Sequence, residues 1–316
     1  MTTKTNHFKL SSSSILIILL VIGQFISVST SNAQTRAFLF NNGYNYLLAD
    51  KEKAVEQFTK AIEIDSNFSA AYFYRGIAEF KLGHYEQAIN DFTRVNQLDT
   101  NLKVAHMYKG FAYRQLGDNQ KSLESLSTYL DSQNELSALD YNMLGKAKMK
   151  AGDLDGAIDN FAAALTESKN ESQHYYLFLA LFGNRDYDEA LDQINLAIVE
   201  NNDFYGYYIN RGNTLFMTGN FNKALVDYNY AITLEPEVPD SYYLRARTLD
   251  TLGRHEKAIL DFSRAIELNP TDGTYYSKRG NARFSSGNKR AACMDWTIAG
   301  NLGYYEDFDK IKSLCD

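Results

Sequence analysis

The chain has 316 residues, of which 45% are hydrophobic and 14% aromatic, and its formal net charge is −7. This apolar content excludes an intrinsically disordered chain, and the acidic balance argues against a protein that neutralises nucleic-acid phosphates. With only two cysteines, the chain is neither a disulfide-dense scaffold nor a four-cysteine zinc protein.

The N-terminal segment has the pattern of a secretory signal peptide. Two lysines precede an apolar stretch over residues 15–28, and small and polar residues follow it. We expect a signal peptide over residues 1–33 that is cleaved between Ala33 and Gln34, because small residues occupy the −3 and −1 places of that site. The protein would then be exported and would be periplasmic, envelope-associated or secreted. An uncleaved signal that anchors the chain in the membrane is the alternative.

One sequence unit recurs along the rest of the chain. A small residue recurs, mostly in steps of 34 residues, and a large apolar residue follows each one by four positions. The small residues are Ala54, Ala88, Ser122, Ala157, Ala190, Ala224, Ala258 and Ala292. A period of this length predicts a stacked repeat array rather than two globular domains.

Each unit has the pattern of a helical hairpin. In residues 69–102, apolar residues fall at helical spacing over 70–81, and Gly83 is placed to end that helix. A second apolar face extends over residues 85–98, and the small Gly76 would let the two helices approach closely. Such a hairpin cannot bury its apolar face alone, so we expect neighbouring units to stack.

The unit resembles the tetratricopeptide repeat. The residues that carry the resemblance are AYFYRGIAEFKLGHYEQAINDFTRVNQLD. That family's pattern has an aromatic residue at position 4, Gly or Ala at 8, Gly at 15, Ala at 20, an aromatic residue at 24, Ala at 27 and Pro at 32 of its 34 residues. Phasing from residue 35 gives eight units, which are 35–68, 69–102, 103–137, 138–170, 171–204, 205–238, 239–272 and 273–306. The resemblance implies an all-α, right-handed superhelical solenoid of about eight helix-turn-helix hairpins, closed by a capping helix over residues 307–316.

Two units depart from the pattern. The first has Asn42 and Ala49 where glycines are expected. The fifth has Phe178 and Arg185 at these places. Because its Gly183 comes two residues early, we expect a longer turn in that hairpin.

Four units share a second feature, an Arg at position 7 and an Asp at position 23. The pairs are Arg75 with Asp91, Arg211 with Asp227, Arg245 with Asp261, and Arg279 with Asp295. We predict a charge-assisted bond that ties the two helices of each hairpin together. Pairing of each Asp with the Arg of the following unit fits less well, because Asp295 would then have no partner.

The last residues predict a cap for the stack. Tyr304, Phe308, Ile311 and Cys315 lie on one stripe of a short helix that would cover the last repeat. Cys293 occupies a repeat position that is apolar elsewhere and faces the next helix, and the tail resembles the closing segment of many secreted bacterial tetratricopeptide proteins. We expect Cys293 and Cys315 to form a disulfide in an oxidising compartment, worth roughly 3 kcal/mol. Two separate small hydrophobic residues in the last core layer are the alternative.

Residues that could carry chemistry are sparse. No two histidines have the spacing of a metal site, and the motifs of serine hydrolases and phosphate-binding loops do not occur in the sequence. His106 and His174 replace the aromatic residue at position 4, for which packing is the better explanation. We therefore expect no catalytic residue, no metal, no cofactor and no enzymatic activity.

The resemblance implies a binding surface instead. In tetratricopeptide proteins, positions 2, 5, 9 and 12 of the first helix line a concave groove. The corresponding residues here are Phe73, Ile77, Phe80, Met107, Phe111, Asn142, Lys146, Asn213, Phe216, Tyr243, Arg247, Asn281 and Phe284. The basic and asparagine set that grips a peptide's C-terminal carboxylate in some family members is not reproduced in its usual arrangement. Aromatic residues at helical spacing also fit plain core packing.

These features favour a non-enzymatic, exported scaffold that holds a peptide segment or partner domain in its groove. An accessory module that recruits a cell-envelope enzyme, or a module that binds glycan or peptidoglycan, are the alternatives. We expect a protein or peptide partner, no nucleic acid, and no membrane insertion once the signal is cleaved. The sequence leaves the oligomeric state open.

Overall fold

The computed structural model describes residues 31–133, 135–306 and 308–315, and every regular element in these residues is a helix. Residues 1–30, which hold most of the expected signal peptide, lie outside the described residues. Ala33 and Gln34, which flank the expected cleavage site, lie in the first described helix. None of the described helices combines the length and the apolar character needed to cross a bilayer.

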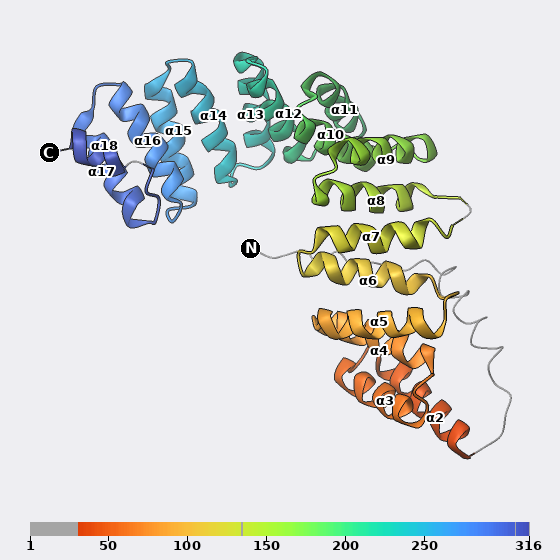
Figure 1. The fold of residues 1–316 in the computed structure, drawn as a ribbon. Coiled ribbons are helices and arrows are strands. Elements are labelled where there is room, and N and C mark those ends of the chain that lie inside the picture. The colour runs from red at the N-terminus through yellow and green to blue at the C-terminus, as the bar shows by residue number, and fades with distance from the viewer. Residues whose placement is uncertain (1–30, 134, 307, 316) are drawn as a thin grey trace. The chain divides into compact units, whose positions relative to one another are not determined.

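The chain divides into two compact units, residues 1–132 and 133–316. In the first unit the described helices form three consecutive pairs (Figure 1). They are α2 (Ser31–Tyr46), α3 (Lys51–Ile64), α4 (Ser69–Leu82), α5 (Tyr85–Leu98), α6 (Val104–Gln115) and α7 (Asn119–Leu130).

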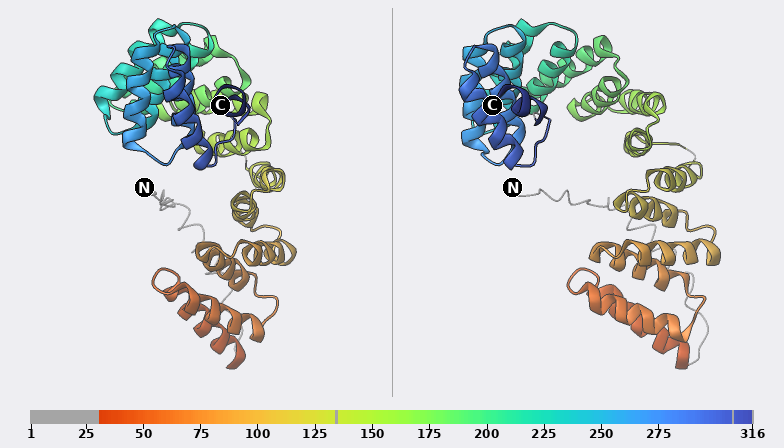
Figure 2. Two further views of the ribbon diagram at one scale, coloured as in Figure 1. Left: turned by 90° about the vertical axis from the view of Figure 1, so that its left-hand side faces the viewer. Right: turned by 60° about the vertical axis from the view of Figure 1, so that its left-hand side comes forward.

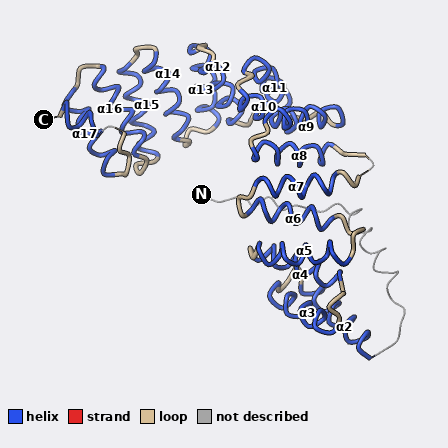
Figure 3. Tube along the Cα trace, in the orientation of Figure 1, coloured by secondary structure: helices blue, strands red, loops and turns tan. Residues whose placement is uncertain are grey.

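The second unit contains five further pairs and a short last helix (Figure 2 and Figure 3). The helices are α8 (Ala138–Ala151), α9 (Leu154–Glu167), α10 (Glu171–Asn184), α11 (Tyr187–Glu200), α12 (Tyr205–Met217), α13 (Phe221–Leu234), α14 (Pro239–Thr251), α15 (His255–Leu268), α16 (Gly273–Ser285), α17 (Lys289–Asn301) and α18 (Phe308–Leu314). In both units each even-numbered helix packs on the odd-numbered helix that follows it, and within a unit that helix packs on the next pair. The expected all-α stack of hairpins is therefore what the chain forms.

Glycine shapes the second hairpin in two ways. Gly83 follows α4 in the left-handed region at φ 86°, and the N–H groups of Gly83 and His84 bond back to carbonyls of the last turn. This confirms Gly83 as the residue that ends the helix. A Cβ added to Gly76 would lie 2.8 Å from the Phe92 ring, so the close approach of α4 and α5 depends on this glycine.

The first and fifth hairpins differ from the sequence expectation. In the first, Gly43 rather than Asn42 occupies the position that faces the buried ring of Phe58. In the fifth, the turn is not longer. Arg185 itself adopts the left-handed conformation, at φ 70°, and α11 begins two residues later, as in the hairpin that Gly83 closes. Gly183 lies inside α10 instead of ending it.

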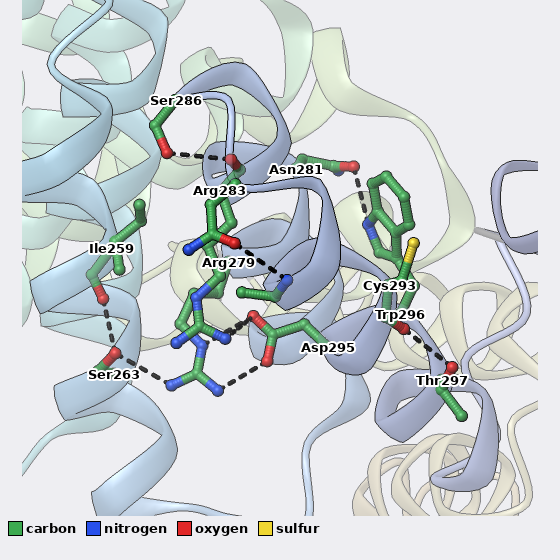
Figure 4. A network of polar contacts seen from close by, with 12 residues as sticks. Ile259, Ser263, Arg279, Asn281, Arg283, Ser286, Cys293, Asp295, Trp296 and Thr297 are labelled. Atoms are coloured by element: carbon green, nitrogen blue, oxygen red, sulfur yellow. Dashed lines mark hydrogen bonds and ion pairs between the residues drawn. The ribbon is translucent and has the colours of Figure 1, made fainter. Parts of the chain in front are cut away.

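Each of the four Arg–Asp pairs is a two-pronged ion pair between the helices of one hairpin. In the last hairpin, Arg279 Nε and Nη2 donate to the two carboxylate oxygens of Asp295 at 3.0 and 2.8 Å (Figure 4). The other three pairs have the same geometry, with shortest N–O distances of 2.6–2.7 Å. The prediction of a bond within each hairpin is confirmed.

These arginines also reach the preceding hairpin, which the sequence comparison did not reveal. Each Nη1 donates to a polar side chain on the preceding odd-numbered helix at 2.7–3.1 Å. The acceptors are Thr59, Asn195, Asn229 and Ser263. Each guanidinium also lies 5.4–5.6 Å from the ring centroid of the tyrosine three residues before it. We call this set of contacts the clasp.

The clasp places an ion pair inside the stack. Asp91, Asp227 and Asp295 are at most 5% exposed, and their only ionic partners among the described residues are arginines. Hydrogen bonds donated to the partner carboxylate raise the pKa of Arg75 and Arg211 above the ordinary value of arginine. Burial raises the pKa of Asp91, and the hydrogen bonds from Arg75 act in the opposite direction.

The second unit ends in a fastened cap. A disulfide joins Cys293 on α17 to Cys315, which follows α18, and their Cα atoms are 5.6 Å apart. Lys310 on α18 donates to Asn281 Oδ1 at 2.8 Å, so the cap also contacts the first helix of the last hairpin. The short last helix is held to the end of the stack by the disulfide, by this hydrogen bond and by the Lys310 ammonium, which lies 5.6 Å from the centroid of the Trp296 ring.

Candidate functional site

Within each unit, consecutive even-numbered helices lie against one another along one side. The neighbours are α4 with α6, α8 with α10, α12 with α14, and α14 with α16. We call this side of a unit its inner face, and the side formed by odd-numbered helices its outer face. The thirteen residues that the sequence assigns to a groove all lie on even-numbered helices, five in the first unit and eight in the second.

Three of these residues do not line a surface. Phe73 is 1% exposed and packs edge-on against Phe92 and Tyr108, and Ile77 is 8% exposed. Asn142 is 6% exposed. The expectation that these three line a groove is corrected, because packing buries their side chains; for Phe73 the covering Tyr108 ring comes from the next hairpin.

The remaining residues of the first unit form a small aromatic surface. Phe80 and Met107 are half-buried, and the Phe80 ring lies 5.5 Å from that of Tyr85. Phe111 lies under the guanidinium of Arg114, 5.2 Å from its ring centroid. Burial lowers the pKa of Arg114. Each ring is already in contact with a neighbour in its own hairpin.

In the second unit, four of the expected residues come together on α12 and α14. The Arg247 guanidinium lies 4.4 Å from the centroid of the Phe216 ring, a close cation–π contact. Asn213 Oδ1 accepts a hydrogen bond of 2.9 Å from the hydroxyl of Tyr228, which comes from α13. Tyr243 lies one helical turn before Arg247; burial raises the pKa of Tyr243, and the positive charge of Arg247 acts in the opposite direction.

Arg247 is the distinctive group of this cluster. Its Nε is buried and has no hydrogen-bond partner within the described part of the chain. No carboxylate of the described residues lies within salt-bridge distance of its guanidinium, whereas all four clasp arginines have one. Burial raises the pKa of Tyr228 and Tyr243, so the surrounding hydroxyls stay neutral. The cluster therefore carries a positive charge that its own residues do not neutralise.

Two further expected groove residues, Asn281 and Phe284, lie near the end of the second unit. Both already contact residues of the last hairpin or the cap. Asn281 Oδ1 accepts from Trp296 Nε1 at 3.2 Å (Figure 4) and from Lys310 on the cap. Phe284 is 42% exposed and packs against Trp296. At the other end of the unit, Lys146 Nζ lies 3.7 Å from the centroid of the Tyr176 ring.

Sequence reasoning missed two buried residues of odd-numbered helices that bond to expected groove residues. Tyr228 and Trp296 hold the repeat position that is Phe, Leu or Ile in the other hairpins. They carry a polar atom, and each donates it to the asparagine of its own hairpin, Asn213 or Asn281. Only these two hairpins have asparagine at that repeat position. The joint occurrence of Asn with Tyr or Trp in one hairpin could therefore have been recognised in the sequence.

The described residues contain no cluster of three or more His, Cys, Asp or Glu side chains that could hold a metal ion. The polar groups of the inner face are instead amides, hydroxyls and single cations, which are suited to hydrogen bonding and charge recognition.

Solved structures with a similar fold are tetratricopeptide proteins. One, from Parabacteroides merdae, is 19% identical over 79% of this chain and 99% of its own, with a TM-score of 0.58. The C-terminal part of a TPR repeat-containing protein from Cytophaga hutchinsonii is 18% identical over 73% of this chain and 95% of its own, with a TM-score of 0.60. YrrB, described as a TPR protein with an unusual peptide-binding site, is 22% identical over 58% of this chain and 94% of its own, with a TM-score of 0.50. No curated protein matches the sequence significantly.

Family models described as tetratricopeptide repeat match four stretches of the sequence. The stretches are residues 45–68, 69–102, 142–206 and 239–272. They fall in both compact units and agree with the helix pairs of the structure. The chain belongs to the tetratricopeptide repeat family.

Proposed function

We propose that this protein is an exported scaffold that binds an acidic peptide segment of a partner protein on the inner face of its second unit. The observation that carries the proposal is Arg247, a half-buried cation on that face with no carboxylate partner among the described residues. Tetratricopeptide repeats form protein-interaction scaffolds, so a peptide is the expected class of ligand.

The surroundings of Arg247 favour a carboxylate next to an apolar side chain. A guanidinium presents several donors in one plane and binds carboxylates with charge-assisted bonds. The Phe216 ring beneath it is half-buried and offers an apolar surface beside the charge. A segment in which Asp or Glu alternates with Leu or Phe would use both groups. The arrangement is a single anchor and not a multi-residue clamp.

Peptide binding can be tested with fluorescent probes of defined chemistry. The probes are short peptides of alternating Glu and Leu, and identical peptides in which Gln replaces Glu. We expect the Glu peptide to bind and the Gln peptide not to bind. The Arg247→Gln variant should bind the Glu peptide about tenfold or more weakly, since hydrogen bonds to charged groups contribute about 1.5–3 kcal/mol.

The matched control is Arg254→Gln, which removes an exposed arginine beyond the end of the same helix. It should leave binding unchanged. Equal binding of the two peptides, or equal loss in the two variants, would argue against an acidic ligand at Arg247.

Export rests on separate support. The apolar segment over residues 15–28, with two lysines before it and small residues at positions 31 and 33, has the signal pattern, and a disulfide at the chain end suits an oxidising compartment. Mass spectrometry of the protein from its host should find a chain that begins at Gln34. A protein that retains residues 1–33 and sediments with membranes would instead support an uncleaved anchor.

A further inference from the structure

The outer face of the second unit changes character along the repeats. Two residues after the repeated alanine or serine, the first five hairpins carry Glu56, Asn90, Glu124, Asp159 and Asp192. The last three carry Val226, Leu260 and Met294 at the same place. These three apolar side chains are 65%, 70% and 59% exposed, so the repeat fold does not bury them. Such a row of exposed apolar residues marks an interaction surface.

The basic end of this face lies on α17. Arg290, Met294 and Ile298 follow one another at intervals of four residues and form a stripe that is basic at its start and apolar after it. Beside the stripe, α17 and α18 enclose an open hollow of about 800 Å³ lined by Ile298, Ile311 and Leu314, with Lys289 and Arg290 at its edge. No acidic residue among those described pairs with Lys289 or Arg290.

The opposite stripe lies on α11 in the same unit. Asp188 and Asp192 are exposed, and Leu196 and Val199 follow on the same side at 44% and 81% exposure. This stripe is acidic at its start and apolar after it. It matches the α17 stripe with the charge reversed at the first position and an apolar residue at the third, whereas Asp192 stands where α17 has Met294.

We propose that the outer face of the second unit docks on the same face of a second copy of this chain. A two-fold axis parallel to the helices would reverse the order of the helices and keep their direction. It would set α11 of one copy against α17 of the other, and α13 against α15. Such an axis makes one face complementary to itself, as an isologous dimer requires.

The matched repeat positions give the pairs that this arrangement brings together. Asp188 faces Arg290, Leu196 faces Ile298 beside the hollow, and Val226 faces Leu260. Near the axis, Tyr230 faces Arg264, a pairing that can form a cation–π contact. The opposed charges of Asp188 and Arg290 lie at one end of the helices, Asp192 meets Met294 beside them, and Leu196 meets Ile298 toward the other end.

The face extends over four helices of 13–14 residues, each about 20 Å long. Stable specific interfaces bury about 800 Å² on each partner.

The test is a charge-reversal cycle followed by sedimentation velocity over a concentration series, with the protein purified as its host produces it. The acidic-stripe variant is Asp188→Lys with Asp192→Lys, and the basic-stripe variant is Lys289→Glu with Arg290→Glu. We expect the wild type to dimerise, and each variant alone to dimerise at least about tenfold more weakly, because like charges then meet. An equimolar mixture of the two variants should dimerise again.

The matched control is Glu52→Lys with Glu56→Lys on α3, which changes the same repeat positions in the first unit. It should dimerise like the wild type. A wild type that stays monomeric, or a mixture that fails to restore the dimer, would overturn the proposal. A monomer that binds phosphatidylglycerol vesicles, with binding lost only in the basic-stripe variant, would also overturn it and assign that stripe to a membrane surface.

Discussion

The hairpins of residues 138–204 and those of residues 205–306 belong to the same unit but are fastened differently. In the later three, an ionised clasp joins the two helices of each hairpin and the helix before them. In the earlier two, the same positions hold Leu144 with Asn160 and Leu177 with Gln193. There, Gln193 bonds to the buried His174 at 2.8 Å, and Asn160 bonds only within its own helix.

This difference teaches that one repeat fold can be held by two kinds of contact. Apolar packing is common to both regions, whereas the clasp adds a directional link between neighbouring hairpins. The Arg247 cluster lies on α12 and α14, which are both clasped. A binding surface on such helices has a support that resists local opening.

The largest effect is expected from breaking a clasp. Asp227→Ala would leave the guanidinium of Arg211 without its carboxylate inside the stack, which costs about 3 kcal/mol or more. Hydrogen exchange should then show loss of protection in α12 and α13. Gln193→Ala, at the same repeat position of an unclasped hairpin, should cost about 1 kcal/mol. Similar losses in both variants would show that the clasp adds nothing.

A nearly equal effect is expected at the chain end, where a covalent link reinforces the clasped region. Cys315→Ser opens a loop of 22 residues and should destabilise the end of the stack by about 3 kcal/mol. Hydrogen exchange should increase in α17 and α18 and stay unchanged in α8. The wild type under reducing conditions should match the variant; full protection after reduction would contradict a stabilising disulfide.

A smaller change should strengthen the unclasped region. Arg185 holds a left-handed conformation in which every other turn of this kind has glycine. Arg185→Gly should therefore stabilise the protein by about 1 kcal/mol. The urea midpoint should rise with an unchanged slope. The reverse change in a clasped hairpin, Gly219→Arg, should lower the midpoint by a similar amount.

The smallest net effect is expected from installing a clasp pair. In Leu144→Arg with Asn160→Asp, the new ions lose hydration about as much as they gain in attraction, so stability should change by less than about 0.5 kcal/mol. Each single change should destabilise, and the double-mutant cycle should give a coupling of about 1 kcal/mol or more. Additive effects would mean that the hairpin cannot bring the two groups together.

Much of the fold could be predicted because repetition averages out local ambiguity. The period of 34 residues located the hairpins, and the coincidence of Arg and Asp in the same units located the clasp. Arg185 was misread because its turn looked defective without glycine, yet the flanking helices force the same conformation on an arginine. The glycine that faces Phe58 was expected at position 42 and is Gly43. In the first hairpin, this glycine is one residue closer in sequence to the repeated alanine than in the other hairpins.

The candidate site was predicted less completely. A repeat position fixes which helix a side chain occupies but not what the next hairpin places over it, so Phe73 and Asn142 were assigned to a groove and are buried. Arg247 was identified as a groove residue. Its lack of a carboxylate partner could not be predicted, because it depends on how three helices pack together.

The sequence by itself determined the hairpin, its period, its clasp and the place of the two cysteines near the chain end, because each of these depends on residues within one repeat or on its regular recurrence. Only the tertiary structure decided which side chains remain accessible, how each clasp reaches the preceding hairpin, and that Lys310 of the cap contacts Asn281. These depend on distances between neighbouring hairpins, which are set by packing and leave no regular trace in the order of the residues.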